Sequence, residues 1–316
     1  MSDKLLTGHA PHILGGKSVS SIMWDVIIAL IPVSLVSIYY FGLKALILIL
    51  VSMASAMIIE GAFFAIRGKG IKHGLGIRDG SAAVTGLLIA LILPPTAPLW
   101  LAVIASAVAI LLAKQAYGGI GNNIFNPALV ARAFVFMAWP SLMTAWSNPL
   151  TISNWLADLT SGATPLGGAE HSLFEMFLGN TGGSLGETSA LAIIVGGLYL
   201  LLKGHIDWRI PVGYLGTAAV FAFFTSKFSF YDVAFNLLAG GMLFAAVFMA
   251  TDMVTSPTTK TGRLIFGIGC GLITMFVRKY ASAPEGVTYA ILFMNALVPI
   301  IERYTVPKTF GGVKGA

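Results

Sequence analysis

The chain has 316 residues, of which 57% are hydrophobic and only 10% are charged, whereas an ordinary soluble domain has about 25% charged residues. Its 19 Lys+Arg and 13 Asp+Glu residues are too few to cover a soluble fold of this length. The formal net charge is +6, but the basic residues stand singly between apolar runs, without the dense patch that phosphate binding requires. The composition therefore excludes a soluble protein and a nucleic-acid partner, and it predicts an all-α polytopic membrane protein.

Apolar runs that can cross a bilayer follow one another along the chain and predict about ten transmembrane helices. The first five runs lie at about 22–41, 44–66, 81–93, 99–115 and 127–143. The second five lie at about 188–202, 210–226, 230–250, 264–280 and 286–301. The first run has the length of a full span, so we expect it to remain as a helix and not to be cleaved as a signal peptide.

These runs divide the chain into five segments, which are a 1–21 N-terminal segment, a 22–143 five-helix half, a 144–187 loop, a 188–303 five-helix half and a 304–316 tail. An even number of spans puts both termini on the same side of the membrane. The long loop contains no Lys or Arg, and the other connections on its side contain only Lys44, Lys227, Arg278 and Lys279. Because short basic loops stay in the cytoplasm, the termini are predicted to be cytoplasmic and the 144–187 loop extracytoplasmic.

The two halves resemble each other weakly but in order. In the first half, a run ending in Leu93-Pro94-Pro95-Thr96 precedes a span, a Gly-rich turn and a span opened by Asn126-Pro127. In the second half, a run ending at 251–257 precedes a Gly-rich span, a turn at Pro284-Glu285-Gly286 and a span that contains Asn295. Because each half has an odd number of spans, we predict inverted repeats, a design that recurs in transporters. Duplication does not by itself prove transport.

Polar side chains inside spans are costly in lipid, so each needs a partner or a function. Arg132 lies early in the last span of the first half, and two interpretations stay open: it snorkels or pairs with backbone, or it binds an anionic or carbonyl group of a cofactor. Asp25 and Glu60 lie near span ends, where we expect interfacial positions. Asp252 lies where an apolar run breaks and suits a cation or a flavin ring edge, although a helix N-cap fits nearly as well.

Cys270 is the one cysteine of the chain, which excludes an intramolecular disulfide and any multi-thiolate iron–sulfur or zinc site held by this chain alone. It lies in a Gly-rich apolar run, which favours a small buried packing residue over a reactive thiol. We predict no metal site and no catalytic residue in this chain. If electrons pass through the protein, another cofactor carries them.

A short pattern in the 144–187 loop carries the clearest chemistry. It reads D-x-x-[ST]-G-A-T, and its members are Asp158, Ser161, Gly162, Ala163 and Thr164. The small residues leave the Thr164 hydroxyl accessible to a modifying enzyme, and the proline that follows keeps the segment extended. Taken alone the string also fits an ordinary turn, but it matches the acceptor at which an extracytoplasmic transferase joins the FMN phosphate to threonine.

Further motifs occur in order along the chain, namely Ala10-Pro11-His12 to Ile22-Met23, GNNIFNPALVARAF at 121–134, ATDMVTSPTTKTGR at 250–263 and PEGVTYAILFMNALVP at 284–299. With the acceptor motif and the topology, they make the chain resemble a family of membrane subunits from about residue 10 to Phe310-Gly311. This family includes the D subunit of the Rnf electron-transport complex and the B subunit of the sodium-pumping NADH:quinone reductase. The B subunit usually has a longer N-terminal extension, so the short segment before the first span favours the Rnf type.

The resemblance implies a ten-helix inverted repeat similar to urea channels, with covalent FMN at Thr164. It also implies a second, noncovalent flavin, expected to be riboflavin, within the helices. We expect this flavin near Asn123, Asn126 and Arg132, because amides and a guanidinium complement the imide and N1 edge of the ring. For Asn126, a helix-capping role before Pro127 fits equally well.

The implied function is that of a flavin-carrying subunit of a translocase in the cytoplasmic (inner) membrane of a prokaryote. The complex passes electrons between ferredoxin and NAD and couples this transfer to Na+ or H+ movement. Other Rnf subunits (A, B, C, E and G) would handle NAD and ferredoxin, and a flavin transferase would be needed for maturation. Three alternatives stay open: the quinone-reductase subunit, a stand-alone small-solute channel of the same fold, and a structural scaffold.

Overall fold

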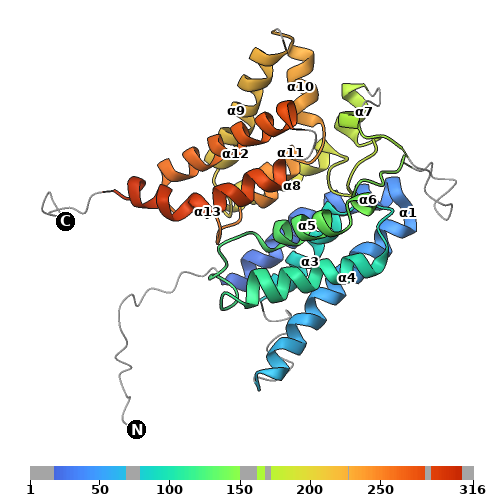
Figure 1. The fold of residues 1–316 in the computed structure, drawn as a ribbon, viewed down its shortest axis with the longest axis vertical. Helices are drawn as coiled ribbons and strands as arrows, with labels where there is room; N and C mark the ends of the chain where they lie inside the picture. The colour runs from blue at the N-terminus through green and yellow to red at the C-terminus, as the bar shows by residue number, and fades with distance from the viewer. Residues whose placement is uncertain are drawn as a thin grey trace, which may run out of the picture.

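The computed structural model describes residues 18–68, 79–149, 162–167, 172–226, 228–281 and 286–307. Within these ranges the chain folds into helices and contains no β-strand (Figure 1). The elements are α1 (Val19–Ile66), α3 (Ser81–Ile92), α4 (Leu99–Ala107), η1 (Val108–Gln115), α5 (Pro127–Ala138), α6 (Pro140–Met143), η3 (Pro165–Gly167), α7 (Leu173–Leu178), α8 (Ala190–Lys203), α9 (Arg209–Thr225), α10 (Phe230–Leu238), α11 (Met242–Phe244), η4 (Ala245–Met249), α12 (Lys260–Tyr280) and α13 (Val287–Thr305).

The first two predicted spans form the two arms of α1. Ser18 caps the N-terminus of this helix by accepting a hydrogen bond from the Ser21 N–H at 3.1 Å. A straight helix of 48 residues would be about 72 Å long, more than twice the ~30 Å hydrocarbon core. Gly42 interrupts it with φ 67° and ψ −149°, a conformation that glycine adopts without steric cost. The predicted break between the two spans is therefore confirmed at Gly42.

The short helix α3 lies at the centre of the first half, and all of its residues, Ser81–Ile92, are buried. It packs along α1, where Gly86 allows the two backbones to approach closely. A Cβ at Gly86 would lie 2.6 Å from the Ser52 carbonyl oxygen and 2.7 Å from the Met53 Cα. With 12 residues, α3 is about 18 Å long. Both of its ends therefore lie inside the protein.

The second half is built around the packing of α9 on α12. Gly267 of α12 lies so close to α9 that a Cβ there would meet the Ile210 carbonyl oxygen at 2.6 Å. The fully buried Tyr214 of α9 shares a hydrogen bond of 2.7 Å with Thr274 of α12. Figure 1 shows α1, α3, α4 and α5 gathered below α9, α12 and α13. The two groups meet where α5 contacts α13 and where α1 contacts α8.

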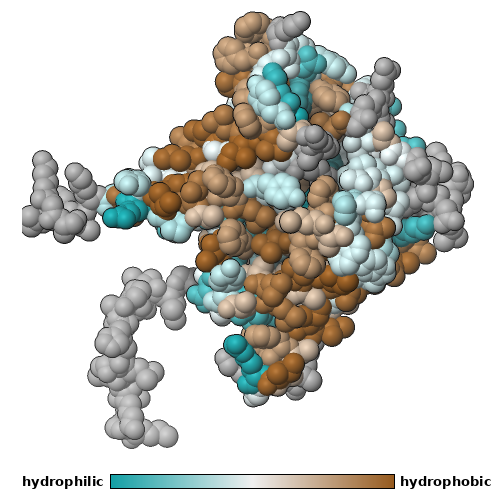
Figure 2. All heavy atoms as spheres, in the orientation of Figure 1, coloured by the Kyte–Doolittle hydropathy of each residue, from teal (hydrophilic) through white to brown (hydrophobic). Residues whose placement is uncertain are grey.

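The outer surface of the molecule is strongly apolar. Large apolar side chains such as Ile58, Leu112 and Phe293 are more than half exposed, and Figure 2 shows apolar surface over α12, α13 and α4. Among the described helices, α1 and α12 are long and apolar enough to cross a membrane. The bent pair of α10 with α11 and η4, which turns by 67°, is a third candidate. The predicted all-α membrane class is confirmed, whereas the ten crossings and their inversion stay predictions.

Candidate functional site

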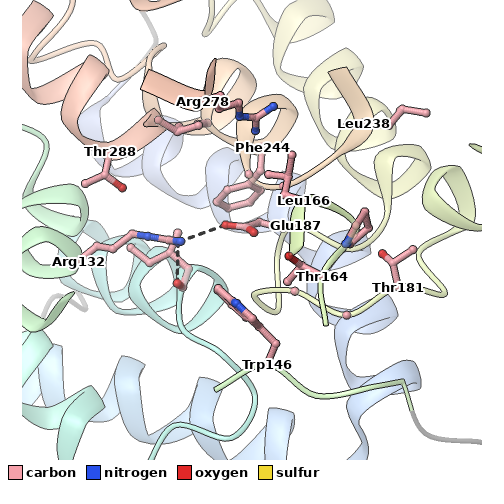
Figure 3. Close-up of a pocket in the computed structure, with 18 of the residues that line it drawn as sticks. Arg132, Trp146, Thr164, Leu166, Thr181, Glu187, Leu238, Phe244, Arg278 and Thr288 are labelled. Atoms are coloured by element: carbon pink, nitrogen blue, oxygen red, sulfur yellow. Dashed lines mark hydrogen bonds and ion pairs between the residues drawn. The ribbon is translucent and has the colours of Figure 1, made fainter. Parts of the chain in front are cut away.

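Two cavities lie at the opposite ends of α3. The first, which we call the Thr164 cavity, is partly open to solvent, has about 740 Å³ of empty space including that opening, and is shown in Figure 3. The second, the Asn123 cavity, is also partly open and has about 820 Å³ of empty space on the same measure. Ile92, the last residue of α3, lines the Thr164 cavity, and Ser81, its first residue, lines the Asn123 cavity.

A buried ion pair in the Thr164 cavity holds the C-terminal end of α3. The Nη1 of Arg132 donates to the Ile92 carbonyl oxygen at 2.7 Å and lies 3.3 Å from Oε1 of Glu187 (Figure 3). The side chains of Arg132 and Glu187 are only 6% and 9% exposed. Both interpretations of Arg132 from the sequence therefore stay open. It pairs with backbone, and it also lines a cavity in which a cofactor group could bind.

The chain segment before α8 satisfies the remaining carbonyls at this helix end. The Gly186 N–H donates to the Leu91 carbonyl at 2.7 Å, and the Leu185 N–H donates to the Leu93 carbonyl at 3.2 Å. Gly186 is required there, because a Cβ would lie 2.9 Å from Leu91 Cβ and 3.2 Å from the Phe244 ring. Helix ends inside a membrane protein need such partners, since no water is present to supply them.

The described part of the acceptor motif, Gly162 to Thr164, lies against the protein at this cavity. The Gly162 N–H donates to the Trp146 carbonyl at 3.0 Å. A Cβ at Gly182 would lie 3.1 Å from the carbonyl oxygens of Ala163 and Ser147, so the segment packs tightly. Thr164 is half-buried and lines the cavity. Asp158 and Ser161, the other two motif residues, lie outside the described residues.

The lining of the Thr164 cavity combines aromatic rings with cations. Trp146 and Phe244 present rings, and Arg132 and Arg278 bring guanidinium groups (Figure 3). Arg278 of α12 is held in place by donating to the Asn236 carbonyl at 2.8 Å and to the Ala239 carbonyl at 2.9 Å. Such a set can bind a planar aromatic ring together with an anionic group.

Gly240 and Gly241 line this cavity where their backbone lies too close to neighbouring side chains to leave room for a Cβ. A Cβ at Gly240 would lie 2.8 Å from Leu166 Cδ1 and 3.1 Å from Arg278 Nη2. A Cβ at Gly241 would lie 2.5 Å from Glu187 Oε1. Any side chain at these two positions would therefore displace the charged groups of the cavity.

Asn126 acts as the N-cap of α5, on the side of the Asn123 cavity. Its Oδ1 accepts hydrogen bonds from the N–H groups of Ala128 at 3.0 Å and Leu129 at 3.3 Å. Its Nδ2 donates to the Met249 carbonyl at 3.3 Å, which ties α5 to the end of η4. The capping interpretation of Asn126 is confirmed.

The three residues expected around a second flavin do not share one cavity. Asn123 and Asn126 line the Asn123 cavity, whereas Arg132 lines the Thr164 cavity. Asn123 is buried, and its Nδ2 donates to the Phe125 carbonyl at 3.3 Å. The other polar residues that line the Asn123 cavity are Ser81, Thr85, Lys114, His205, Thr251 and Asp252.

Glu60 lies near the end of α1, as expected, and it is buried against protein. Its side chain is 4% exposed, and its Oε1 lies 2.7 Å from the Lys114 Nζ and accepts from the Gln115 Nε2 at 2.6 Å. Lys114 also donates to the Ser81 Oγ at 2.6 Å. Lys114 and Gln115 end η1, which is wound as a π-helix, a form that is frequent at functional sites.

Asp25 forms a second polar cluster beside the Asn123 cavity. One of its carboxylate oxygens accepts from the Tyr199 hydroxyl at 2.6 Å, and the other lies 2.7 Å from the His205 Nε2. Asp252 instead organises its own turn, accepting from the Val254 N–H at 3.4 Å and from the Thr255 hydroxyl at 3.1 Å. This local use of Asp252 resembles the capping role that its sequence position allowed.

The partners of these charges were not predicted from the sequence. A buried Arg132 needs a carboxylate, and the 144–187 loop contains carboxylates but no Lys or Arg. Glu187, the last residue of that loop, was therefore a candidate partner. Lys114 stands within an apolar run, which is itself a signal of a buried ion pair. His205 carries no such signal, because its position beside Asp25 depends on the packing of α8 on α1.

Apolar outer surfaces, helix ends inside the protein and cavities lined by buried charges define a helical membrane protein with internal polar cavities. The chain belongs to the NQR2, RnfD, RnfE family, whose model matches residues 6–311.

Several relatives that match along nearly the whole chain are named as D subunits of ion-translocating oxidoreductase complexes. An Acetobacterium woodii protein, named as the D subunit of a Na(+)-translocating ferredoxin:NAD(+) oxidoreductase complex, is 43% identical and covers 98% of this chain and 96% of its own length. A Clostridium ljungdahlii protein, named as the D subunit of a proton-translocating complex of the same activity, is 41% identical over 96% of this chain and 95% of its own. Stutzerimonas stutzeri has a D subunit of an ion-translocating oxidoreductase complex that is 42% identical over 93% of each chain.

Proposed function

We propose that this chain is the D-type membrane subunit of an ion-translocating ferredoxin:NAD oxidoreductase complex, and that it carries flavin. The names of its relatives support the complex, and the Thr164 cavity carries the flavin assignment. In that cavity a half-buried threonine, two aromatic rings and two guanidinium groups line one space. Further subunits, including those that bind NAD and ferredoxin, and a flavin transferase are part of the proposal.

The residues around Thr164 fit a covalently attached FMN. The phosphodiester on Thr164 Oγ1 would be anionic, and Arg132 and Arg278 line the same cavity to balance its charge. The Trp146 and Phe244 rings offer apolar faces to the flavin ring. When bound, FMN would supply reversible electron transfer. The tether keeps it at high effective concentration at one position.

For the second, noncovalent flavin we propose the Asn123 cavity. Its buried polar lining offers both donors and acceptors, which a flavin imide edge requires. Asn123 is the amide best suited to the ring, because the side chain of Asn126 already makes three hydrogen bonds to backbone. Arg132 is not part of this site, since it lines the other cavity.

The charge distribution supports a cytoplasmic position for the Asn123 cavity and an extracytoplasmic position for Thr164. Lys114 lines the Asn123 cavity, and Lys203, Arg209 and Arg263 lie at the same end, around the connection from α8 to α9. Basic residues mark the cytoplasmic side of a membrane protein. Thr164 lies at the far end of α3 from this group. The membrane that we propose for the whole subunit is the inner membrane of a prokaryote.

Matching hydrogen bonds support the inverted repeat. Arg132 donates to the Ile92 carbonyl and Asn295 donates to the Thr255 carbonyl, and each bond joins residues 40 positions apart. Pairing these residues between the halves also pairs Pro94 with Pro257 and Tyr117 with Tyr280. In this register α3 pairs with α11 and η4, α4 pairs with α12, and α5 pairs with α13.

The test of the flavin assignment is the Thr164→Val variant of the full chain, isolated from membranes of a host that contains the transferase. We expect the variant to lose the UV-fluorescent flavin band of this polypeptide on a denaturing gel, because valine has no hydroxyl to esterify. Thr181→Val, which also removes a hydroxyl from the cavity lining, is the matched control and should keep the band. A fluorescent Thr164→Val band would refute the assignment.

A second candidate is the B-type subunit of a sodium-pumping NADH:quinone reductase, because the same family model includes the NQR2 type. The intact complex discriminates between the two. Electron transfer between reduced ferredoxin and NAD supports the D-type subunit, whereas reduction of quinone by NADH supports the B-type subunit.

A further inference from the structure

A third cavity adjoins the Asn123 cavity and opens at the molecular surface. This His205 cleft encloses about 700 Å³ between the connection from α8 to α9 and the segment 251–256. Trp208 and Met253, which line it, are 54% and 42% exposed. The residues that line both the cleft and the Asn123 cavity are His205, Ile206, Thr251 and Met253. These four form the wall that the cleft and the Asn123 cavity share.

His205 is the member of this wall whose ring has two nitrogens that can each hold or give up a proton. Its side chain is 4% exposed, and its Nε2 lies 2.7 Å from a carboxylate oxygen of Asp25. A carboxylate only accepts hydrogen bonds, so Nε2 carries the proton of the neutral ring and Nδ1 is left to receive one. The Tyr199 hydroxyl donates to the other oxygen of Asp25 at 2.6 Å and fixes the carboxylate. This arrangement orients the ring and stabilises the imidazolium that forms when Nδ1 is protonated.

Charged groups on the neighbouring elements complete the surroundings of His205. Asp207 in the cleft accepts from Arg209 and Arg263. Burial raises the pKa of the Asp207 carboxyl, but these hydrogen bonds outweigh it and hold the pKa below its usual value, so Asp207 stays ionised at neutral pH. The other groups near the cavity or the cluster are Lys203 on α8, Lys114 with Glu60, and Asp252.

We propose that His205, oriented by Asp25 and Tyr199, relays protons between the His205 cleft and the flavin of the Asn123 cavity. This inference rests on the flavin position proposed above. A flavin bound there would supply two-electron redox chemistry, with electrons from the next carrier of the complex and one proton taken up at its ring. His205 would release that proton from Nδ1, and water in the cleft would return a proton to Nδ1. The same groups would carry the proton in the opposite direction when the electrons leave.

The experiment uses the full chain with Thr164→Val, so that the noncovalent flavin is the one bound to it. A laser flash with an external photoreductant adds electrons to the flavin, and the protonation that follows is read from the visible absorbance of the ring. We expect His205→Ala to slow protonation by about 100-fold, the effect of losing a positioned proton donor. Added imidazole should restore the rate in proportion to its concentration, because the cleft admits a small solute.

Further variants separate a relay from a structural effect. His205→Gln, which can still donate to Asp25 but cannot relay a proton, replaces His205→Ala if the latter does not fold, and it should slow protonation by about 100-fold as well. Asp25→Asn should also be slow, whereas Lys203→Met, which removes an exposed partner of Asp25, should keep the wild-type rate. An unchanged rate in a flavin-containing His205 variant, or slowing of His205→Ala that imidazole does not relieve, would overturn the relay. Absence of noncovalent flavin in the chain with unaltered His205 would instead refute the flavin position itself.

Discussion

The Thr164 cavity and the Asn123 cavity are joined by one buried helix, and each holds one end of it with a basic side chain. At the C-terminal end of α3, Arg132 donates to the Ile92 carbonyl and pairs with Glu187. At the N-terminal end, Lys114 donates to Ser81 and pairs with Glu60. The two ends therefore use the same device in opposite electrostatic surroundings.

The difference between the ends follows from the helix dipole. A cation near a helix C-terminus is stabilised by the dipole, and a cation near an N-terminus is destabilised. Arg132 thus complements α3, and Glu187 is needed mainly because the guanidinium is buried. Lys114 opposes the dipole, so Glu60 neutralises it, and Gln115 supplies a further hydrogen bond to that carboxylate. At the C-terminal end the cation of the ion pair is favoured by the helix dipole, and at the N-terminal end the carboxylate offsets a cation that the dipole disfavours.

The largest expected effect is that of Arg132→Met at the C-terminal end. It leaves Glu187 as a buried charge without this partner and removes a donor from Ile92, so we expect a loss of about 3–5 kcal/mol in the free energy of unfolding. Chemical denaturation of the full chain in mixed micelles measures it. The double variant Arg132→Met/Glu187→Gln should recover a large part of the loss. Equal losses in the single and double variants would show that the ion pair is not the cause.

Lys114→Met tests the N-terminal end of α3. It should lower the free energy of unfolding by less than Arg132→Met does, by about 3 kcal/mol, the lower limit for breaking a buried ion pair. Gln115 still donates to Glu60 in this variant, and the unfavourable charge at the N-terminus of α3 is removed. The same denaturation assay compares the two variants. A Lys114→Met chain that is less stable than Arg132→Met would contradict the dipole argument.

Asn126→Ala should lower the free energy of unfolding by about 2 kcal/mol, through the lost N-cap of α5 and the lost hydrogen bond to Met249. Asn126→Asp keeps a capping acceptor but no Nδ2 donor, and its loss should be about half as large. If the Asp variant is as unstable as the Ala variant, the contact with Met249 and not the cap dominates.

Thr274 lines neither cavity, so Thr274→Val is the control for the cavity variants and has the smallest expected effect. It removes the hydrogen bond to the buried Tyr214 hydroxyl, for an expected loss of about 1 kcal/mol. Its flavin content should equal that of the unaltered chain, measured by absorbance per polypeptide. A loss of flavin here would show that flavin binding in the cavity variants reports general instability.

Several elements were predictable because their signals are local. Gly42 interrupts α1 between the first two predicted spans, and Asn126 with Pro127 starts α5. The partners of Glu60 were not predicted, because Lys114 and Gln115 come from a distant segment that no local pattern connects to it. Asn123, Asn126 and Arg132 were grouped because their amide and guanidinium groups complement a flavin edge. Along α5, however, the backbone rises by about 9 Å between Asn126 and Arg132, enough to put them in different cavities.

From its sequence alone the protein was bound to be a helical membrane protein with a D-x-x-S-G-A-T motif in a loop free of Lys and Arg, because hydropathy, charge and short motifs are properties of the chain itself. The tertiary structure decided which charges meet. It joined Arg132 to Glu187, Lys114 to Glu60 and Asp25 to His205, since in a low-dielectric interior a buried charge is stable only against a partner. Those pairings depend on how α1, α3, α5 and α8 pack, and packing is a property of the folded chain.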